Sequence, residues 1–188
     1  MRKLTVSTLV TLDGVLQDPG GFGEIEQGGW SGPYFDDEAL QFALDHLLAA
    51  DVFLLGRETY ELFKDYWSRA HPGAYTERMN SIPKLVASTT LDEPLEWNAT
   101  LIKGDVAEAI AELKRQPGGD ILMYGSAALM STLMRHDLID EYLFWVHPVV
   151  LGGGKRLFTE GIDKTTLRLA DTKTLSTGVV IMRYQPDR

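Results

Sequence analysis

The sequence predicts an α/β protein whose single central sheet is mixed and ends in antiparallel strands. Over the first two thirds of the chain, short apolar runs followed by a glycine and a helical pattern recur, which is typical of alternating strands and helices. The last third is rich in β-branched residues and has no helical pattern of any length. With 188 residues, 44% of them hydrophobic, the chain fits one domain over 1–188.

The N-terminal segment predicts a strand and then a long loop. Residues 3–10 are rich in β-branched side chains, and Asp13-Gly14 marks a turn after them. A glycine-rich segment with two prolines follows over 17–33, and it is long for a simple connection. We consider two interpretations, a mobile active-site loop and a plain surface loop, and the sequence leaves both open.

The next segment predicts a helix, a buried strand and a second helix. Asp36 or Asp37 can cap the first turn of the first helix. The apolar run 52–55 predicts a central strand covered on both faces, a helix is expected over 58–67, and residues 84–88 predict another such strand. The expected buried stripe of the first helix recurs at helical spacing and comprises Leu40, Ala43, Leu44, Leu47 and Leu48.

The middle of the chain repeats the unit of strand, turn and helix. After a short strand at 101–102, Asp105 and Glu108 have the spacing of a capping box at the start of a helix. An apolar strand over 121–124 leads through a Gly-Ser turn into the next helix, whose expected stripe runs from Leu129 to Met134. Three β-rich segments then complete the sheet, at 142–150, 166–172 and 179–184.

The composition excludes several classes of function. Eighteen Lys and Arg against 27 Asp and Glu give a formal charge of −9, so a nucleic-acid partner is not expected. The absence of cysteine excludes disulfides, thiolate metal sites and a thiol nucleophile, and the four histidines show no metal-ligand spacing. No run of 18 apolar residues occurs, so we expect a cytoplasmic protein without a membrane partner.

Two turns from strand to helix are candidate anion-binding sites. Gly56-Arg57-Glu58-Thr59 offers close backbone approach, an arginine fork and a hydroxyl, and Gly125-Ser126-Ala127-Ala128 offers small residues that suit a pyrophosphate. Neither turn matches GxGxxG or GxxxxGK[ST], so any dinucleotide is bound in another way. Small residues are also common in turns without a ligand, and that alternative stays open.

Together these segments resemble the dihydrofolate reductase-like family, and within it the reductases of bacterial riboflavin biosynthesis. The resemblance covers essentially the whole chain. It rests on five motifs in this order: Thr11-Leu12-Asp13-Gly14, Gly56-Arg57-Glu58-Thr59-Tyr60-Glu61, the run Lys84 to Thr90, Tyr124-Gly125-Ser126, and the run Pro148 to Phe158.

The resemblance implies a three-layer α/β/α fold, a homodimer and a cleft that binds NADPH. Gly56, Arg57 and Thr59 would meet the phosphates, with Arg57 also near the 2′-phosphate, which distinguishes NADPH from NADH. The remaining cofactor-binding candidates fall into three groups: Ser88 and Thr89 for the adenosine, Gly125, Ser126 and Ala127 for the pyrophosphate, and Val10 and Gly14 for the nicotinamide.

Two departures from the family pattern bear on the substrate. Dihydrofolate reductases place a carboxylate inside the first helix, whereas Leu40 stands at about that place here, which argues against folate reduction. The His/Cys signature of the zinc deaminase domain that usually accompanies riboflavin-pathway reductases is missing. We therefore expect a stand-alone reductase of a small heterocyclic substrate, resembling 5-amino-6-(5-phosphoribosylamino)uracil reductase or dihydrofolate reductase.

The catalytic residues are not evident from the sequence, because hydride transfer requires little beyond orientation and a dry pocket. Asp13, Tyr60 or water are candidate proton donors, although Asp13 also fits a plain turn-former. Trp30, Tyr60 and Trp145 are candidate walls for a flat substrate, with ordinary core packing as the alternative. Two competing functions remain open, a non-catalytic dinucleotide-binding protein and a structural dimerisation module.

Overall fold

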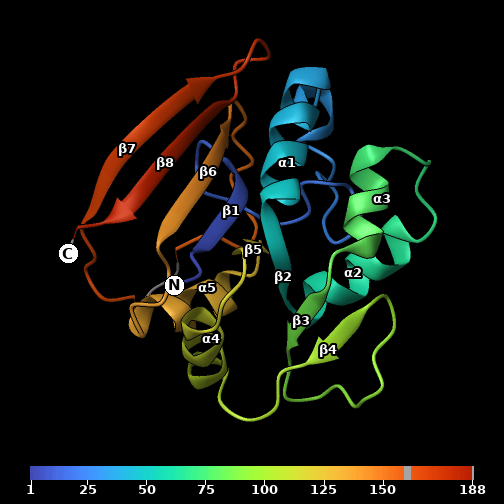
Figure 1. Cartoon of the computed structure of the whole chain (residues 1–188). Helices are drawn as coiled ribbons and strands as arrows, with labels where there is room; N and C mark the ends of the chain where they lie inside the picture. The colour runs from blue at the N-terminus through green and yellow to red at the C-terminus, as the bar shows by residue number, and fades with distance from the viewer. Residues whose placement is uncertain (159–161, 188) are drawn as a thin grey trace.

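The computed structural model describes residues 1–158 and 162–187, and its strands form one eight-stranded sheet (Figure 1). The strand order is β4-β3-β2-β5-β1-β6-β8-β7. Strands β1 to β6 are mutually parallel, and β8 is antiparallel to both of its neighbours. The strands are β1 (Leu4–Thr11), β2 (Ala50–Gly56), β3 (Lys84–Ala87), β4 (Ala99–Leu101), β5 (Asp120–Tyr124), β6 (Glu141–His147), β7 (Leu167–Thr174) and β8 (Val180–Pro186).

Helices cover both faces of the sheet, so the expected three-layer α/β/α architecture and mixed sheet are confirmed. Helices α4 and α5 pack on one face through Ile110, Leu129 and Leu133. Helices α1, α2 and α3 cover the opposite face, on the right in Figure 1. The helices are α1 (Asp37–Ala49), α2 (Arg57–Trp67), α3 (Ala74–Ser81), α4 (Val106–Arg115) and α5 (Ala127–Arg135), with a short 3-10 helix at Gly32–Tyr34.

The predicted caps explain where two of the helices begin. Asp36 accepts a hydrogen bond from the Ala39 N–H at 3.0 Å, and Asp105 accepts one from the Glu108 N–H at 2.9 Å. Each carboxylate pairs a backbone donor that has no partner inside its helix. The register of α1 differs from the prediction, because its buried stripe is Ala39, Ala43 and Leu47, at a strict spacing of four residues.

Leu40 and Leu48 of α1 are 40% and 57% exposed, so their predicted burial is wrong. The physical reason for Leu40 is its position over a cavity rather than over the sheet. Helix α3 was not predicted, because its sequence contributes a single fully buried apolar side chain, Met79, and shows no helical stripe. Strand β6 ends at His147 rather than Val150, where Pro148 has no N–H for the sheet ladder.

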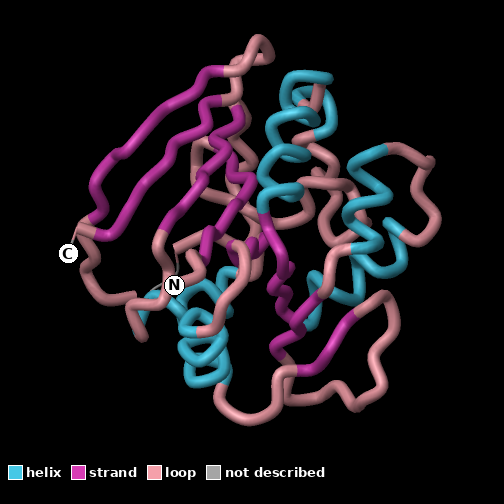
Figure 2. The backbone as a smooth tube through the Cα atoms, viewed as in Figure 1, coloured by secondary structure: helices cyan, strands magenta, loops and turns pink. Residues whose placement is uncertain are grey.

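The antiparallel strands β8 and β7 form the end of the sheet that lies away from α2 and α3 (Figure 2). Glu38 of α1 ties this end to the helical layer, since it accepts a hydrogen bond from the Ser176 N–H and pairs with Lys173 at 2.8 Å. No helix in the described part of the chain is long and apolar enough to cross a membrane.

The parallel strands create one position in the sheet that is favourable for a ligand. Strands β2 and β5 are hydrogen-bonded neighbours, but the chain leaves β2 for α2 on one face and leaves β5 for α5 on the other. In open α/β sheets, connections that leave two neighbouring strands on opposite faces create a crevice beyond the carboxyl ends of those strands. The two candidate anion-binding turns are the two turns that leave this point.

Candidate functional site

The starts of α2 and α5 lie in direct contact at the crevice. A Cβ atom on Gly56 would stand 2.8 Å from Ser126 Oγ and 3.1 Å from Ser126 Cβ, so only glycine fits there without a shift. Thr59 lies at the same place, with its Oγ1 3.9 Å from the position of a Cβ on Gly125. The structure therefore brings the two predicted phosphate turns together.

Both helix starts have backbone geometry that suits an anion. Gly56 is the N-cap of α2, and no side chain caps the first turn of that helix. Gly125 and Ser126 both adopt left-handed conformations, with φ of 60° and 58°, and a non-glycine residue held there costs about 1 to 3 kcal/mol. Ser126 caps α5 by accepting from the Leu129 N–H at 3.3 Å. N-terminal N–H groups and the helix dipoles favour negative charge at this point.

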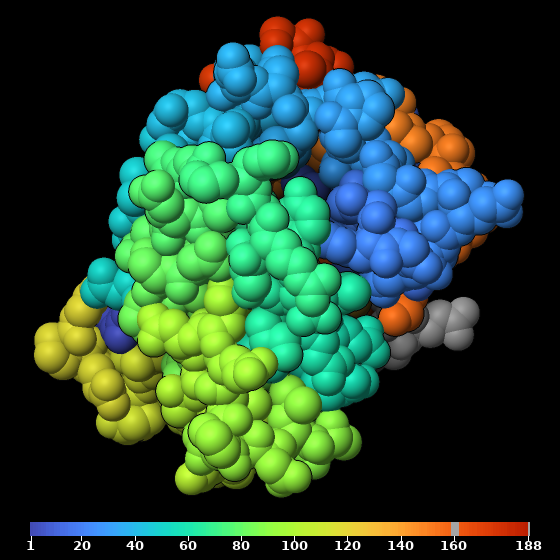
Figure 3. All heavy atoms as spheres, turned by 90° about the vertical axis from the view of Figure 1, so that its right-hand side faces the viewer, coloured from blue at the N-terminus to red at the C-terminus, as the bar shows by residue number. Residues whose placement is uncertain are grey.

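A cavity of about 700 Å³ adjoins these helix starts, which is within the range of small-molecule sites. In Figure 3 the surface is hollowed between the blue N-terminal segment and the green surface of α2 and α3. Five of the predicted site residues line this cavity, namely Thr59, Gly125, Ser126, Ala127 and Trp145. Leu40 and Ala43 of α1 also line it, so Leu40, which stands at about the place expected for the carboxylate of dihydrofolate reductases, lies at the cavity.

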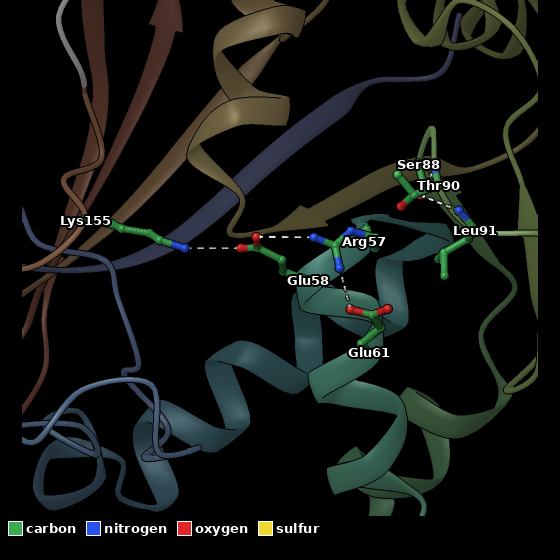
Figure 4. A network of polar contacts seen from close by, with 7 residues as sticks. All are labelled: Arg57, Glu58, Glu61, Ser88, Thr90, Leu91 and Lys155. Carbon is green, nitrogen blue, oxygen red and sulfur yellow. Dashed lines mark hydrogen bonds and ion pairs between the residues drawn. The ribbon is translucent and has the colours of Figure 1, made fainter.

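Arg57 lies at the first turn of α2 with two acidic partners (Figure 4). Its Nη1 is 3.0 Å from Glu61 Oε2, and its Nη2 is 3.6 Å from Glu58 Oε1. Glu58 also pairs with Lys155 at 3.2 Å, which joins the loop after β6 to α2. An incoming phosphate would therefore have to replace one of these half-exposed ion pairs, which are individually weak.

Ser88 follows β3 directly beside this network, because Ala87 is the register partner of Gly56. Its Oγ accepts hydrogen bonds from the N–H groups of Thr90 and Leu91, both at 3.1 Å, which forms a tight turn. Ser88 and Thr89 thus lie at the carboxyl edge of the sheet one strand beyond Arg57, although neither lines the cavity.

The glycine-rich segment is a compact loop built around the buried carboxylate of Asp18. This carboxylate accepts hydrogen bonds from four backbone N–H groups, those of Phe22, Gly23, Glu24 and Ile25. A Cβ on Gly28 would clash with Asp18 Oδ2, so glycine is required there. Sequence reasoning did not single out Asp18, and the DPGG turn around it was the available signal.

Trp30 anchors the far end of this loop in the core instead of lining the cavity. Its Nε1 donates to the Gln17 carbonyl at 2.8 Å, and its ring packs edge-on against His147 with centroids 5.1 Å apart. His147 is buried at the end of β6, and burial lowers its pKa, so the imidazole is held neutral.

Asp13 serves as an ionised clamp between two loops. It accepts hydrogen bonds from Thr11 Oγ1 at 2.6 Å and from the Gly152 and Leu151 N–H groups at 2.8 and 3.2 Å. These hydrogen bonds, led by that of Thr11, lower the pKa of Asp13 to about 2. Such a carboxylate has no proton to give at neutral pH, which argues against Asp13 as the proton donor.

Tyr60, Val10 and Gly14 also lie outside the cavity lining. Tyr60 is buried between α2 and the sheet, and its hydroxyl donates to the Glu96 carbonyl and accepts from the Glu96 N–H. Val10 packs in the core beneath α5. Gly14 has a φ of 79° in the turn after β1, with no atoms within 4 Å of its Cβ position. Proton donation or ring stacking by Tyr60 would require a rearrangement of this core.

Comparison with known proteins identifies the family. The model of the RibD C-terminal domain matches residues 2–181. The chain belongs to this family. An uncharacterized protein of Bacillus subtilis (strain 168), YyaP, is 34% identical over an alignment of 188 positions. The alignment covers 97% of this chain and 94% of that protein.

Solved structures with the same fold include a putative riboflavin biosynthesis protein and a dihydrofolate reductase. A putative riboflavin biosynthesis protein from Shewanella sp. PV-4 superposes with a TM-score of 0.71 at 22% identity, covering 99% of each chain. A dihydrofolate reductase from Enterococcus faecalis, complexed with NADP(H), superposes with a TM-score of 0.65 at 16% identity, covering 99% of this chain and 97% of that one. At these identities the similarity establishes the fold.

Proposed function

We propose that this RibD C-terminal domain protein is an NADPH-dependent reductase of a small heterocyclic substrate. The observation that carries the proposal is the contact between the starts of α2 and α5, beside a cavity and at a point where the connections leave neighbouring strands on opposite faces of the sheet. Bound NADPH would supply a hydride to the substrate. Gly56, Thr59 and Ser126 would hold its pyrophosphate, and Arg57 would meet the 2′-phosphate.

The residues present fit this cofactor in three respects. The first turn of α2 has no side-chain cap, so its N–H groups can bind phosphate oxygens. Gly56 and Gly125 leave room for close backbone approach. Arg57 and Ser88 directly follow a register pair of β2 and β3, so they lie close together at the end of the sheet. This position supports binding of the adenosine next to the phosphates. The cavity on the other side of the helix starts has room for the nicotinamide and a flat substrate.

The substitution Gly56→Ala tests this phosphate site. Its Cβ would push Ser126 and separate the helix starts, so we expect NADPH affinity to fall at least about tenfold and stability to fall by about 1 to 3 kcal/mol. Gly73→Ala is the matched control, since Gly73 also precedes a helix but has no atoms within 4 Å of its Cβ position. Equal NADPH affinity in both variants would contradict the proposed phosphate site.

Turnover is tested by NADPH consumption with heterocyclic, imine and carbonyl acceptors. Consumption that depends on the acceptor is the expected result. NADPH binding without consumption across the panel would instead support the alternative, a dinucleotide-binding protein that does not turn over.

A further inference from the structure

The floor of the cavity carries three hydroxyl groups that the cofactor site does not use. Ser7 on β1 and Tyr124 on β5 are register partners, so their side chains lie side by side on one face of the sheet. Tyr75 reaches the same place from α3, and its hydroxyl is 3.4 Å from that of Tyr124. All three residues line the cavity. The floor is therefore polar but uncharged.

Packing holds each of these side chains in a fixed position. The ring of Tyr124 lies edge-on to Phe53 with centroids 4.9 Å apart, and the ring of Tyr75 packs against Trp67 at 5.2 Å. Ser7 Oγ accepts a hydrogen bond from Trp145 Nε1 at 3.0 Å. Fixed donors and acceptors of this kind confer specificity because little ordering is needed when a ligand binds.

The hydroxyls of Tyr75 and Tyr124 offer two hydrogen-bond donors but make one hydrogen bond between them. Each hydroxyl can donate one hydrogen bond, and the only hydrogen bond of either within the described chain is the one between them. One O–H therefore remains available to donate to a ligand. Burial raises the pKa of Tyr124 to about 12 and that of Tyr75 well above its usual range, so both groups stay protonated at neutral pH.

The charged residues around the cavity come from other segments. Asp18 and Glu24 lie on the glycine-rich loop, Glu58 lies on the first turn of α2, and Lys155 and Arg156 follow β6. The sheet floor and α3 contribute no charged side chain to the lining. A ligand that bears a charge at the floor would lose its hydration without gaining a counter-charge there.

We propose that Ser7, Tyr75 and Tyr124 form the substrate-recognition edge of this cavity, and that the substrate is a flat, uncharged ring whose carbonyl oxygen or ring nitrogen accepts a hydrogen bond from the tyrosine pair. The proposal rests on the proposed reductase function, because the three residues would contact the substrate in the part of the cavity that the nicotinamide leaves free. It makes Tyr75 and Tyr124 specificity-determining residues.

The test uses three probes and calorimetry on the protein saturated with NADP⁺, which cannot transfer a hydride. Coumarin is flat and neutral and has a carbonyl, naphthalene has the shape without the carbonyl, and coumarin-3-carboxylate adds a charge. We expect coumarin to bind, and coumarin-3-carboxylate to bind at least about tenfold more weakly. Failure of coumarin to bind, or equal binding of its carboxylate, would overturn the proposal.

The double variant Tyr75→Phe/Tyr124→Phe removes both hydroxyls and keeps both rings. We expect coumarin affinity to fall about three- to tenfold while naphthalene affinity is unchanged. Tyr66→Phe is the matched control, because Tyr66 lines the cavity outside the floor and is 49% exposed. An unchanged coumarin affinity in the double variant would also overturn the proposal. NADP⁺ binding is measured first on every variant. Loss of NADP⁺ binding would count against the proposed cofactor site, and it is thereby distinguished from a failure of the substrate proposal.

Discussion

At the scale of single residues, the chemistry of the site depends on partners that lie far away in the sequence. Arg57 was predicted from its motif, and the structure adds that Glu58 and Glu61 already hold its guanidinium. Asp13 was a candidate acid, and its clamp to the Gly152 N–H makes it a poor one. Neither environment could be predicted, because ion pairs and hydrogen bonds follow from the final packing of several segments.

The substitution Arg57→Ala tests the 2′-phosphate contact at this scale. A charge-assisted hydrogen bond contributes about 1.5 to 3 kcal/mol, so we expect NADPH affinity to fall at least about tenfold and NADH affinity to change little. Arg115→Ala is the control, since Arg115 also pairs with an acid on its own helix. Equal losses for NADPH and NADH in the Arg57 variant would refute the contact, and titration calorimetry measures both.

Lys84 gives a prediction for pH dependence. Its side chain is 1% exposed and donates to the Asn80 and Ile82 carbonyls, and desolvation lowers its pKa to about 8 from 10.5. Between these values the unfolded chain binds more protons than the folded chain, so the free energy of unfolding rises with pH. We expect a rise on the order of 2 kcal/mol from pH 8 to 10, measured by urea denaturation.

The variant Lys84→Met isolates this effect, since it lacks the titrating group. Its unfolding free energy should be lower at neutral pH, where the Asn80 and Ile82 carbonyls lose their donor, and should lack this rise. The same slope in both proteins would show that other groups cause it. Above pH 10 the tyrosine pair acts with the opposite sign, because its folded-state pKa values are raised.

At the scale of elements, the sequence predicted the strands and helices whose positions depend on the apolar pattern and on turn residues. Strand β2 and helices α2, α4 and α5 were expected from buried runs and caps, and they are present with shifts of one or two residues. Helix α3 was missed because it shows no apolar stripe, and Tyr75 was therefore missed as a cavity residue. The structure of the loop over 17–33 was missed because its order comes from one carboxylate, Asp18.

The substitution Asp18→Ala tests whether that carboxylate organises the loop. Four N–H groups lose a charged acceptor, so we expect a loss of stability of about 2 to 4 kcal/mol and faster hydrogen exchange at residues 22–25. Asp45→Ala is the control, because Asp45 is exposed and pairs only with Gln41 among the described residues. Unchanged exchange at 22–25 would show that the loop is held by Trp30 and its neighbours instead.

At the scale of the whole molecule, the strand order determines where the proposed ligand site lies. The helices after β2 and β5 leave on opposite faces, and their starts meet beside a cavity that α1, α3 and the glycine-rich loop complete. The fold class and the two turns from strand to helix were predictable because local sequence controls them. The cavity floor was not, since Ser7, Tyr75 and Tyr124 come together only in the folded chain. The homodimer that the resemblance implies stays a prediction.

The most direct test of the reductase proposal is a calorimetric titration of the purified protein with NADPH and, in parallel, with NADH. The proposed site predicts saturable binding of one NADPH per chain, with an affinity at least about tenfold higher than that for NADH. Binding of neither nucleotide would contradict the proposed function and leave only the family and the fold established, and equal affinities would contradict the role of Arg57.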